Sequence, residues 1–453
     1  MRFAPHAIVL SIGLTIAIGV LGPSAVVPDV GGFSLGLRPS PYLVIGMAAL
    51  AVVLGGLGLI GGILGNLTGR KLMLLGCVAA GILAFLPPSG SGDHLNYAVY
   101  GRMVTLGIDP YTHGAVDLPG DPIADAVEKP WREEPSVYGP VATGVQALAS
   151  WIGGDSLRVT ILVLALVNAA AFIATGLLLQ RLTPRAALLW TANPLLLYHL
   201  VAGMHVDTLA IALVTAALAL RAKPLLAGAL FGLGVGVKVN AGLVALGPAW
   251  ELRRNLGRLA VMAGSAVAVV AVGYALVGVR ALAPLSTTSK AVSWASYWKL
   301  VQGWLQGLFG SGAYRTALQV GAVLVIVALA WLMFRAVGRQ ADAPVVAAVL
   351  MTAYVFATPY ILPWYDGFAF AVVALMAASR VDVFLAAHLT VLSLGYLPAR
   401  QEMQPENLGW LVTVVRAQVV PWALLALTLG LGWWAWRAAA RARTLPEPAA
   451  PRP

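Results

Sequence analysis

Asp93 is the residue in this sequence best placed to act as a general base. It opens an acidic, aromatic-rich stretch, Ser89–Pro140, and follows Pro87-Pro88 at the end of an apolar run. Partial burial near a bilayer raises the pKa of a carboxyl group, and a raised pKa suits proton abstraction. The alternative is that Asp93 is the N-cap of a helix spanning Leu95–Leu106, because aspartate favours that position.

His205 and Asp207 form a second polar element within GMHVDTLA. Together with Asp93 they could hold a divalent cation, Mg²⁺ or Mn²⁺, or an acceptor hydroxyl, although an H-x-D pair alone is a weak metal motif. The alternative is a capped helix start, with Asp207 near the positive end of the helix dipole.

Lys238 interrupts the glycine-rich run GLGVGVKVNAGLVAL and has no carboxylate near it in the sequence. A lysine within a membrane segment is costly without a partner, which makes it a candidate functional residue. A phosphate group is a suitable partner for its ammonium. The alternative is that Lys238 extends unpaired to the lipid head groups.

Aromatic residues accompany two of the acidic positions. The turn Tyr360–Asp366 contains Trp364 and Tyr365, and the loop sequence GIDPY contains Asp109 and Tyr111. Aromatic faces can stack on sugar rings, so Tyr111, Trp364 and Tyr365 are candidate sugar-binding residues, and Asp109 joins His205 and Asp207 as a candidate acceptor or metal ligand. The alternative is the aromatic belt found at every membrane interface.

A helical membrane bundle must position these residues. Hydrophobic residues make up 60% of the 453 positions and charged residues only 10%, which excludes a soluble globular domain. About fourteen apolar runs are candidate spans. Some of them are shorter than a full crossing, so the sequence predicts an all-α bundle with 12 to 14 spans. The predicted spans include Pro41–Leu64, Ala186–Gly203, Pro224–Val237 and Ala343–Ala357.

Charge distribution predicts the orientation of this bundle. With the N-terminus cytoplasmic, 17 of the 29 basic residues fall inside and 14 of the 18 acidic residues fall outside. This topology requires Val141–Ile152 to be a surface helix rather than a span. It predicts a plasma-membrane protein with one domain over 1–453, an extracytoplasmic catalytic loop over 88–156 and a cytoplasmic tail over 438–453.

Several motifs, taken together, resemble one enzyme family. The stretches GDHLNYAVYGRMVTLGIDPYTHG, VEKPWREEPSVYGP, TANPLLLYHLVAGMHVDTLAIAL, GVGVKVNAG and LPWY are similar to motifs of the actinobacterial polyprenyl-phosphomannose-dependent α-(1→6)-mannosyltransferases, in the glycosyltransferase C superfamily. The chain departs from the family pattern at His94, where an aromatic or aliphatic residue is more common, and at Val206, where a polar residue is common.

The resemblance implies an inverting transfer of mannose from a polyprenyl-phosphate donor to an extracytoplasmic glycan or glycolipid, forming an α-1,6 linkage. Asp93 would be the base, Lys238 would bind the donor phosphate, and His205 with Asp207 would position the acceptor or a metal. The expected partners are the lipid-linked donor, the acceptor and membrane lipids, with no nucleic acid. The alternatives are a flippase or transporter of lipid-linked sugars without transferase activity, and a non-catalytic scaffold.

Overall fold

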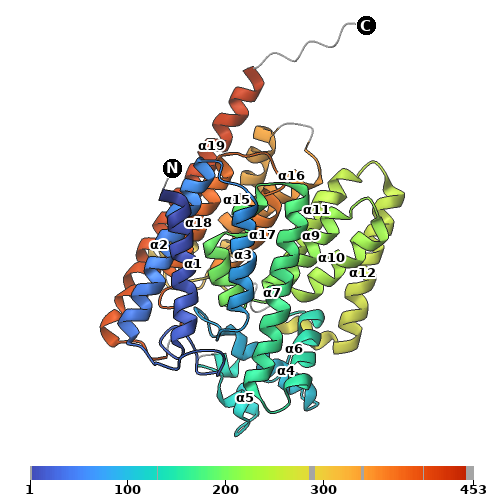
Figure 1. Cartoon of the computed structure of the whole chain (residues 1–453). Helices are drawn as coiled ribbons and strands as arrows, with labels where there is room; N and C mark the ends of the chain where they lie inside the picture. The colour runs from blue at the N-terminus through green and yellow to red at the C-terminus, as the bar shows by residue number, and fades with distance from the viewer. Residues whose placement is uncertain (1–2, 130, 285–290, 338–340, 401, 445–453) are drawn as a thin grey trace.

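The protein folds as a bundle of helices, as a computed structural model of the chain shows (Figure 1). The model describes residues 3–129, 131–284, 291–337, 341–400 and 402–444, and no strand occurs within these ranges. The predicted all-α membrane bundle is therefore confirmed.

Within the described ranges, six stretches are long and apolar enough to cross a membrane. They are α1 (Phe3–Leu21), α2 (Pro41–Leu64), α7 (Leu157–Leu182), α12 (Leu256–Val277), α15 (Arg315–Val337) and Glu406–Arg441, which contains η8 (Glu406–Leu408), the π-helix η9 (Leu411–Val419) and most of α19 (Val420–Thr444).

Shorter helices fill the space between these six. They are α3 (Arg70–Leu83), α9 (Asp207–Ala219), α10 (Pro224–Val237), α11 (Gly242–Glu251), α14 (Trp298–Phe309), α16 (Ala343–Ala357), α17 (Asp366–Val373) and α18 (Arg380–Gly395), with the single turns η5 (Val239–Ala241), η6 (Val279–Leu282) and η7 (Pro363–Tyr365). Helices α2, α10 and α16 have the predicted bounds. Because many helices are shorter than a full crossing, the count of 12 to 14 spans stays a prediction.

The predicted short span Ala186–Gly203 is a broken helix rather than a continuous one. Its parts are the π-helix η3 (Ala187–Thr191), α8 (Pro194–Leu196) and the π-helix η4 (Leu197–Ala202). The break occurs at Asn193, whose side chain accepts hydrogen bonds from the backbone of Leu195 and Leu196 as an N-cap. A broken helix is tolerated at membrane depth because this segment is buried within the protein.

The large acidic loop is itself helical and lies at one end of the bundle (Figure 1). It contains α4 (Asp93–Thr105), η1 (Ala115–Asp117), α5 (Pro122–Asp125), η2 (Trp131–Glu133) and α6 (Pro140–Gly153). The stretch predicted as a surface helix, Val141–Ile152, lies within α6, which packs against α4, α7 and α10.

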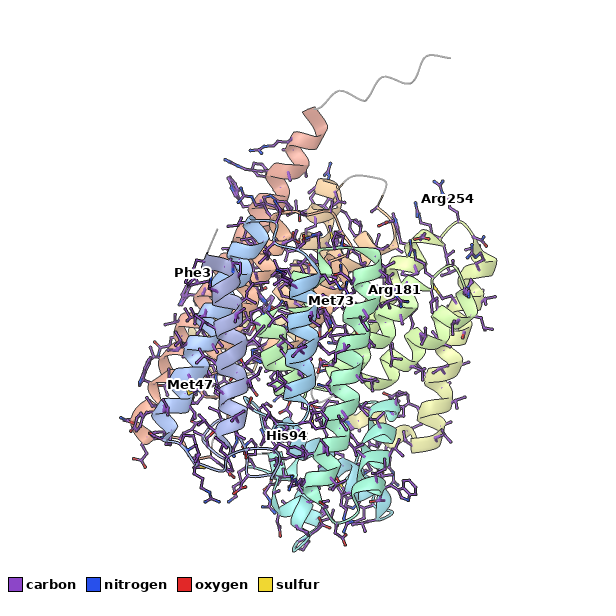
Figure 2. All side chains as sticks on the ribbon, viewed as in Figure 1. Phe3, Met47, Met73, His94, Arg181 and Arg254 are labelled. Atoms are coloured by element: carbon purple, nitrogen blue, oxygen red, sulfur yellow. The ribbon has the colours of Figure 1, made fainter. Side chains whose placement is uncertain are left out.

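The two ends of the bundle differ in character. His94, from the loop, lies at one end, which we call the loop end; Phe3, Arg181 and Arg254 lie at the other, the basic end (Figure 2). The predicted cytoplasmic tail, 438–453, begins within α19, which continues as helix through Thr444, and its position relative to the membrane stays a prediction. The remaining residues, 445–453, lie outside the described ranges.

Candidate functional site

Asp93 is the first residue of α4, and its carboxylate faces the link between η4 and α9 rather than capping its own helix. The N-cap is Gly92, and no side-chain cap bond is made there. Asp93 Oδ2 instead lies 3.4 Å from Nδ1 of His205. That distance is long for a hydrogen bond, so the pair is in electrostatic contact. The N-cap alternative for Asp93 is therefore wrong.

His205 lies in the short link between η4 and α9 and is fully buried. Its imidazole stacks on the indole of Trp364, with ring centroids 3.5 Å apart and planes 16° apart. The backbone carbonyl of His205 accepts a hydrogen bond from the hydroxyl of Thr208. Contacts on both the ring and the backbone fix the position of the imidazole beside Asp93.

Asp207 and Lys238 form a buried ion pair. Nζ of Lys238 lies 2.7 Å and 2.8 Å from the two carboxylate oxygens of Asp207. The Asp207 side chain is 0% exposed and that of Lys238 is 15% exposed. The prediction of an unpaired lysine is wrong, because its partner lies 31 positions earlier in the chain. Asp207 is the first residue of α9, so its predicted place near the positive end of the helix dipole is confirmed, although the helix start has no side-chain cap bond. The ion pair with Asp207 also makes the alternative of a lysine that extends unpaired to the head groups wrong.

The turn η7 covers this group of charges with two aromatic rings. Trp364 covers His205, and the ammonium of Lys238 lies 4.2 Å from the centre of the Tyr365 ring. A cation over an aromatic face is attracted by the ring quadrupole. The structure brings Trp364 and Tyr365 to the site as predicted, but one face of each ring already contacts a protein group, and both residues are buried. Their binding of sugar stays a prediction.

Glycines allow two backbone segments, the end of the acidic loop and the end of α10, to approach each other closely beside Lys238. A Cβ added at Gly139 would lie 2.2 Å from the carbonyl oxygen of Gly236, so a larger residue would separate the end of the acidic loop from the end of α10. The amide of Gly139 donates a hydrogen bond to the carbonyl of Val237. The glycine-rich run therefore joins the loop to the helix end from which Lys238 extends.

Electrostatics at Asp93 differ from the sequence-based expectation. Burial raises the pKa of Asp93, but the nearby His205 and Lys238 together lower it by more. The net pKa of the carboxyl group is therefore below its usual value. The expected net increase is wrong because these partners outweigh desolvation. Asp93 is therefore ionised at neutral pH and able to accept a proton.

Two predicted site residues lie apart from this group. Asp109 accepts a hydrogen bond from the backbone of Tyr111, and the Tyr111 hydroxyl pairs with the hydroxyl of Thr143 at 2.8 Å. No hydrogen bond, ion pair or ring contact joins either residue to Asp93, His205 or Lys238 in the described ranges. Within those ranges there is also no group of three or more His, Cys, Asp or Glu side chains placed to hold a metal.

Sequence reasoning missed an ion pair that holds the acidic loop in place. Glu128, in the loop, pairs with Nε of Arg400 at 2.5 Å, although 272 positions separate them. Arg400 also donates to the backbone carbonyl of Ser24 at 2.6 Å. No local sequence signal could reveal contacts across such separations. A second buried pair joins Asp366 and His388 at 2.8 Å, directly after the aromatic turn.

His94 is the departure from the family pattern, and it is completely buried. Neither ring nitrogen has a hydrogen-bond partner in the structure. Burial, together with the positive charge of Arg400, lowers the pKa of His94 to about 3. His94 is therefore a neutral residue at physiological pH.

A narrow cavity of about 30 Å³ lies behind the site, between α4, α6, α7 and α9. Its lining is mostly apolar and includes Tyr97, Leu164 and Val206. Val206 lies between His205 and Asp207 in the chain, so this apolar space adjoins the charged group.

Comparison with known proteins gives a consistent result. Residues 16–254 match the family model described as alpha-(1->6)-mannopyranosyltransferase, N-terminal domain. The chain is 28% identical over 244 residues to alpha-(1->6)-mannopyranosyltransferase A of Corynebacterium glutamicum, covering 51% of this chain and 49% of that protein. It is 29% identical over 330 residues to the protein of the same name from Mycobacterium tuberculosis, covering 65% and 63%. The chain thus spans about half to somewhat less than two thirds of the length of these relatives, and no solved structure matches.

Proposed function

Because the chain belongs to the alpha-(1->6)-mannopyranosyltransferase family, we propose that it transfers mannose from a polyprenyl-phosphate donor to a glycan or glycolipid acceptor, with an α-1,6 linkage. The observation that carries this proposal is the meeting of Asp93, His205, Asp207 and Lys238 at the loop end. An ionised carboxylate beside an ammonium supplies both a proton acceptor and a group that binds a phosphate.

The proposed reaction is a single displacement. The acceptor hydroxyl oxygen forms a bond to the anomeric carbon, and its proton moves to Asp93. The bond from the anomeric carbon to the phosphate oxygen breaks, and the electron pair leaves with the lipid phosphate. One displacement inverts the anomeric centre, and one base suffices.

Lys238 would stabilise the negative charge that develops on the leaving phosphate. It starts from a bidentate pair with Asp207, so the phosphate must share the ammonium with that carboxylate. Asp207 would hold the ammonium in place, and His205 would hold the carboxylate of Asp93 toward the acceptor. Preorganised groups of this kind lower the barrier because they need little rearrangement during the reaction.

A lipid-linked donor fits the position of the site. An active site on the extracytoplasmic face has no access to cytosolic nucleotide sugars, so the donor must arrive through the membrane. A divalent cation is a further part of the proposal: Asp93 and His205 would be its ligands, whereas the carboxylate of Asp207 is already paired with Lys238.

A transfer assay tests the proposal directly. Purified protein in liposomes is given labelled polyprenyl-phosphomannose and a mannan acceptor, with and without Mg²⁺ or a chelator, and the product linkage is determined. We expect an α-1,6-linked product from the wild type and none from Asp93→Asn. Movement of the labelled lipid between leaflets with no transfer would instead support the flippase alternative.

The side of the membrane on which the candidate site lies needs a separate test. Val116, in the acidic loop, is 46% exposed and suits a reporter cysteine, as does Arg254 at the basic end. In a Cys77→Ser background, an impermeant thiol reagent applied to intact cells should label Val116→Cys and spare Arg254→Cys. Labelling of Arg254→Cys alone would show that the protein has the opposite orientation in the membrane, and it would remove the argument for a lipid-linked donor.

A further inference from the structure

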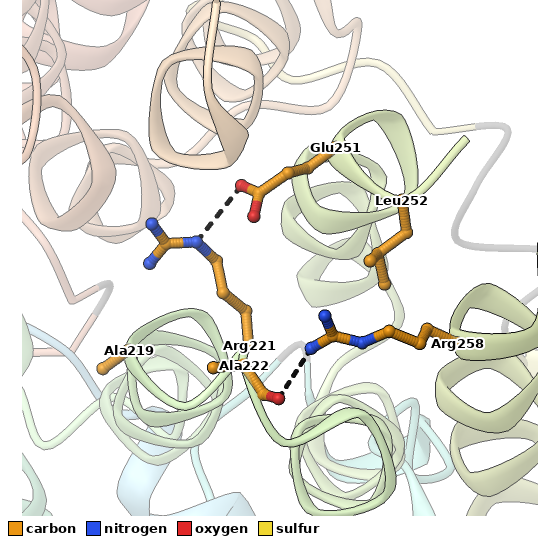
Figure 3. A pocket seen from close by; sticks show the side chains of 6 residues that line it. All are labelled: Ala219, Arg221, Ala222, Glu251, Leu252 and Arg258. Carbon is orange, nitrogen blue, oxygen red and sulfur yellow. Dashed lines mark hydrogen bonds and ion pairs between the residues drawn. The ribbon is translucent and has the colours of Figure 1, made fainter. Parts of the chain in front are cut away.

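A second cavity, with a polar lining, lies at the basic end of the bundle, away from Asp93 and Lys238. It has a volume of about 260 Å³ and lies between the ends of α9 and α11 and the start of α12 (Figure 3). Six residues line it: Ala219, Arg221, Ala222, Glu251, Leu252 and Arg258. We call it the basic-end pocket.

Two guanidinium groups and one carboxylate set the charge of this pocket. Nε of Arg221 lies 3.2 Å from Glu251, and Nη2 of Arg258 donates to the backbone carbonyl of Ala222 at 2.7 Å (Figure 3). Nη2 of Arg221 and both Nε and Nη1 of Arg258 form no hydrogen bond within the described ranges. The lining therefore has a net positive charge and three N–H-bearing nitrogens available to an anion.

The surroundings place this pocket at a lipid boundary. Lys223, Arg253 and Arg254 are exposed nearby in the chain. Leu225 and Leu256, at the starts of α10 and α12, are 67% and 71% exposed. Exposed leucines beside exposed cations are expected where a membrane helix leaves the hydrocarbon layer, because the leucines contact acyl chains and the cations contact head groups.

We propose that the basic-end pocket binds the phosphate group of an anionic membrane lipid. Arginine matches phosphate geometry through paired N–H donors, and basic pockets between membrane helices are suited to acidic head groups. The acyl chains would lie along α12, whose side chains are mostly exposed. Glu251 competes with the phosphate for Arg221, so binding exchanges one carboxylate contact for a phosphate contact.

The test measures lipid binding to the full-length protein in a neutral detergent. Phosphatidylglycerol, phosphatidylcholine and inorganic phosphate are titrated separately, and binding is followed by native mass spectrometry and by the shift in melting temperature. We expect phosphatidylglycerol to bind and stabilise, phosphatidylcholine to do so weakly, and inorganic phosphate at the same concentration to have little effect.

Arginine variants distinguish the pocket from general surface charge. Arg221→Gln and Arg258→Gln should each weaken phosphatidylglycerol binding on the order of tenfold, the cost of one charge-assisted hydrogen bond. Arg335→Gln is the matched control, because Arg335 lies in the last turn of α15, over the ring of Trp331 and outside the pocket lining. If Arg258→Gln fails to fold, Arg221→Gln still decides the question.

Removing the competing carboxylate should have the opposite effect on lipid affinity. Glu251→Gln frees Arg221 and should tighten phosphatidylglycerol binding severalfold. Asp342→Asn removes one negative charge near the same end while keeping the N-cap of α16, and it should leave binding unchanged. Three results would overturn the proposed lipid site. They are an equal change in binding from either control variant, equal binding of phosphatidylcholine and phosphatidylglycerol, and full competition by inorganic phosphate.

Discussion

The same group of helices carries an ion pair at each of its ends, and the two pairs differ in burial. At the loop end, Asp207 and Lys238 are 2.7 Å apart, with side chains 0% and 15% exposed. At the basic end, Arg221 and Glu251 are 3.2 Å apart, with side chains 35% and 41% exposed.

Burial determines what each pair can do. A buried pair is held firmly because separating it leaves an uncompensated charge, whereas an exposed pair is weak and exchanges readily with other ions. The loop end is therefore suited to holding groups in fixed positions for a reaction. The basic end is suited to reversible binding of an anion.

The largest expected effect is on catalysis by Asp93. Asp93→Asn keeps the size of the side chain but removes the proton acceptor, so turnover should fall on the order of a hundredfold to ten-thousandfold. The melting temperature in detergent should change little, because Asp93 caps no helix. Near-normal turnover in this variant would exclude Asp93 as the base and shift attention to Asp207.

Breaking the buried pair should affect folding as well as donor use. Lys238→Ala leaves the Asp207 carboxylate buried without a partner, at a cost of about 3–5 kcal/mol in the free energy of unfolding. The abundance of the variant should therefore fall together with its use of the donor.

The double variant Asp207→Asn/Lys238→Met separates the two effects. It removes both charges, so it should restore most of the stability while transfer from polyprenyl-phosphomannose stays low. Chemical denaturation gives the first quantity and the transfer assay gives the second. Recovery of transfer in the double variant would remove Lys238 from the proposed mechanism.

The buried His94 should make the stability of the loop end depend on pH. Its pKa is about 3 in the folded protein and 6.5 in the unfolded chain. As pH falls below 6.5 the unfolded state takes up the proton first, so stability present above pH 6.5 is lost progressively toward pH 3. The loss should reach about 2 kcal/mol at pH 5.

His94→Phe provides the control for this pH dependence, since phenylalanine has no titrating group. Melting temperatures between pH 7.5 and pH 5 should fall less steeply in the variant than in the wild type. Parallel curves for the two proteins would contradict the assignment of the effect to His94.

The exposed pair should give the smallest effect. Arg221→Gln should lower the free energy of unfolding by less than about 1 kcal/mol in lipid-free detergent, as is usual for exposed ion pairs. A loss of stability as large as that from Lys238→Ala would contradict the proposed difference between the buried and the exposed ion pair. Denaturation of both variants under the same conditions makes the comparison.

Much of the fold was predictable because apolar runs and their flanking charges report directly on membrane helices. Pro41–Leu64, Pro224–Val237 and Ala343–Ala357 begin with proline at the first helical turn, and their predicted bounds match the structure. The break in Ala186–Gly203 was not predicted, because hydropathy does not distinguish a broken buried helix from a continuous one.

The site was predictable as a set of residues but not as a set of contacts. Asp93, His205, Asp207 and Lys238 were each expected at the same membrane face, and the structure joins them. The pairing of Lys238 with Asp207 could not be read from the sequence, since it depends on how α9 packs against α10. Asp109 and Tyr111 were included on the strength of a turn motif, but Asp109 bonds within the turn and the Tyr111 hydroxyl pairs with Thr143 of α6, so neither contacts the charged group within the described ranges.

The aromatic cover of the site also has a consequence for how the protein is made. Trp364 is synthesised 126 residues after Lys238, a delay of roughly 6–25 s at ordinary rates of translation. During that interval the nascent chain already contains Asp93, His205, Asp207 and Lys238, but not the rings that cover His205 and Lys238. A ribosome stalled late in this interval would therefore hold a chain in which His205 and Lys238 lack the aromatic rings that cover them in the folded protein.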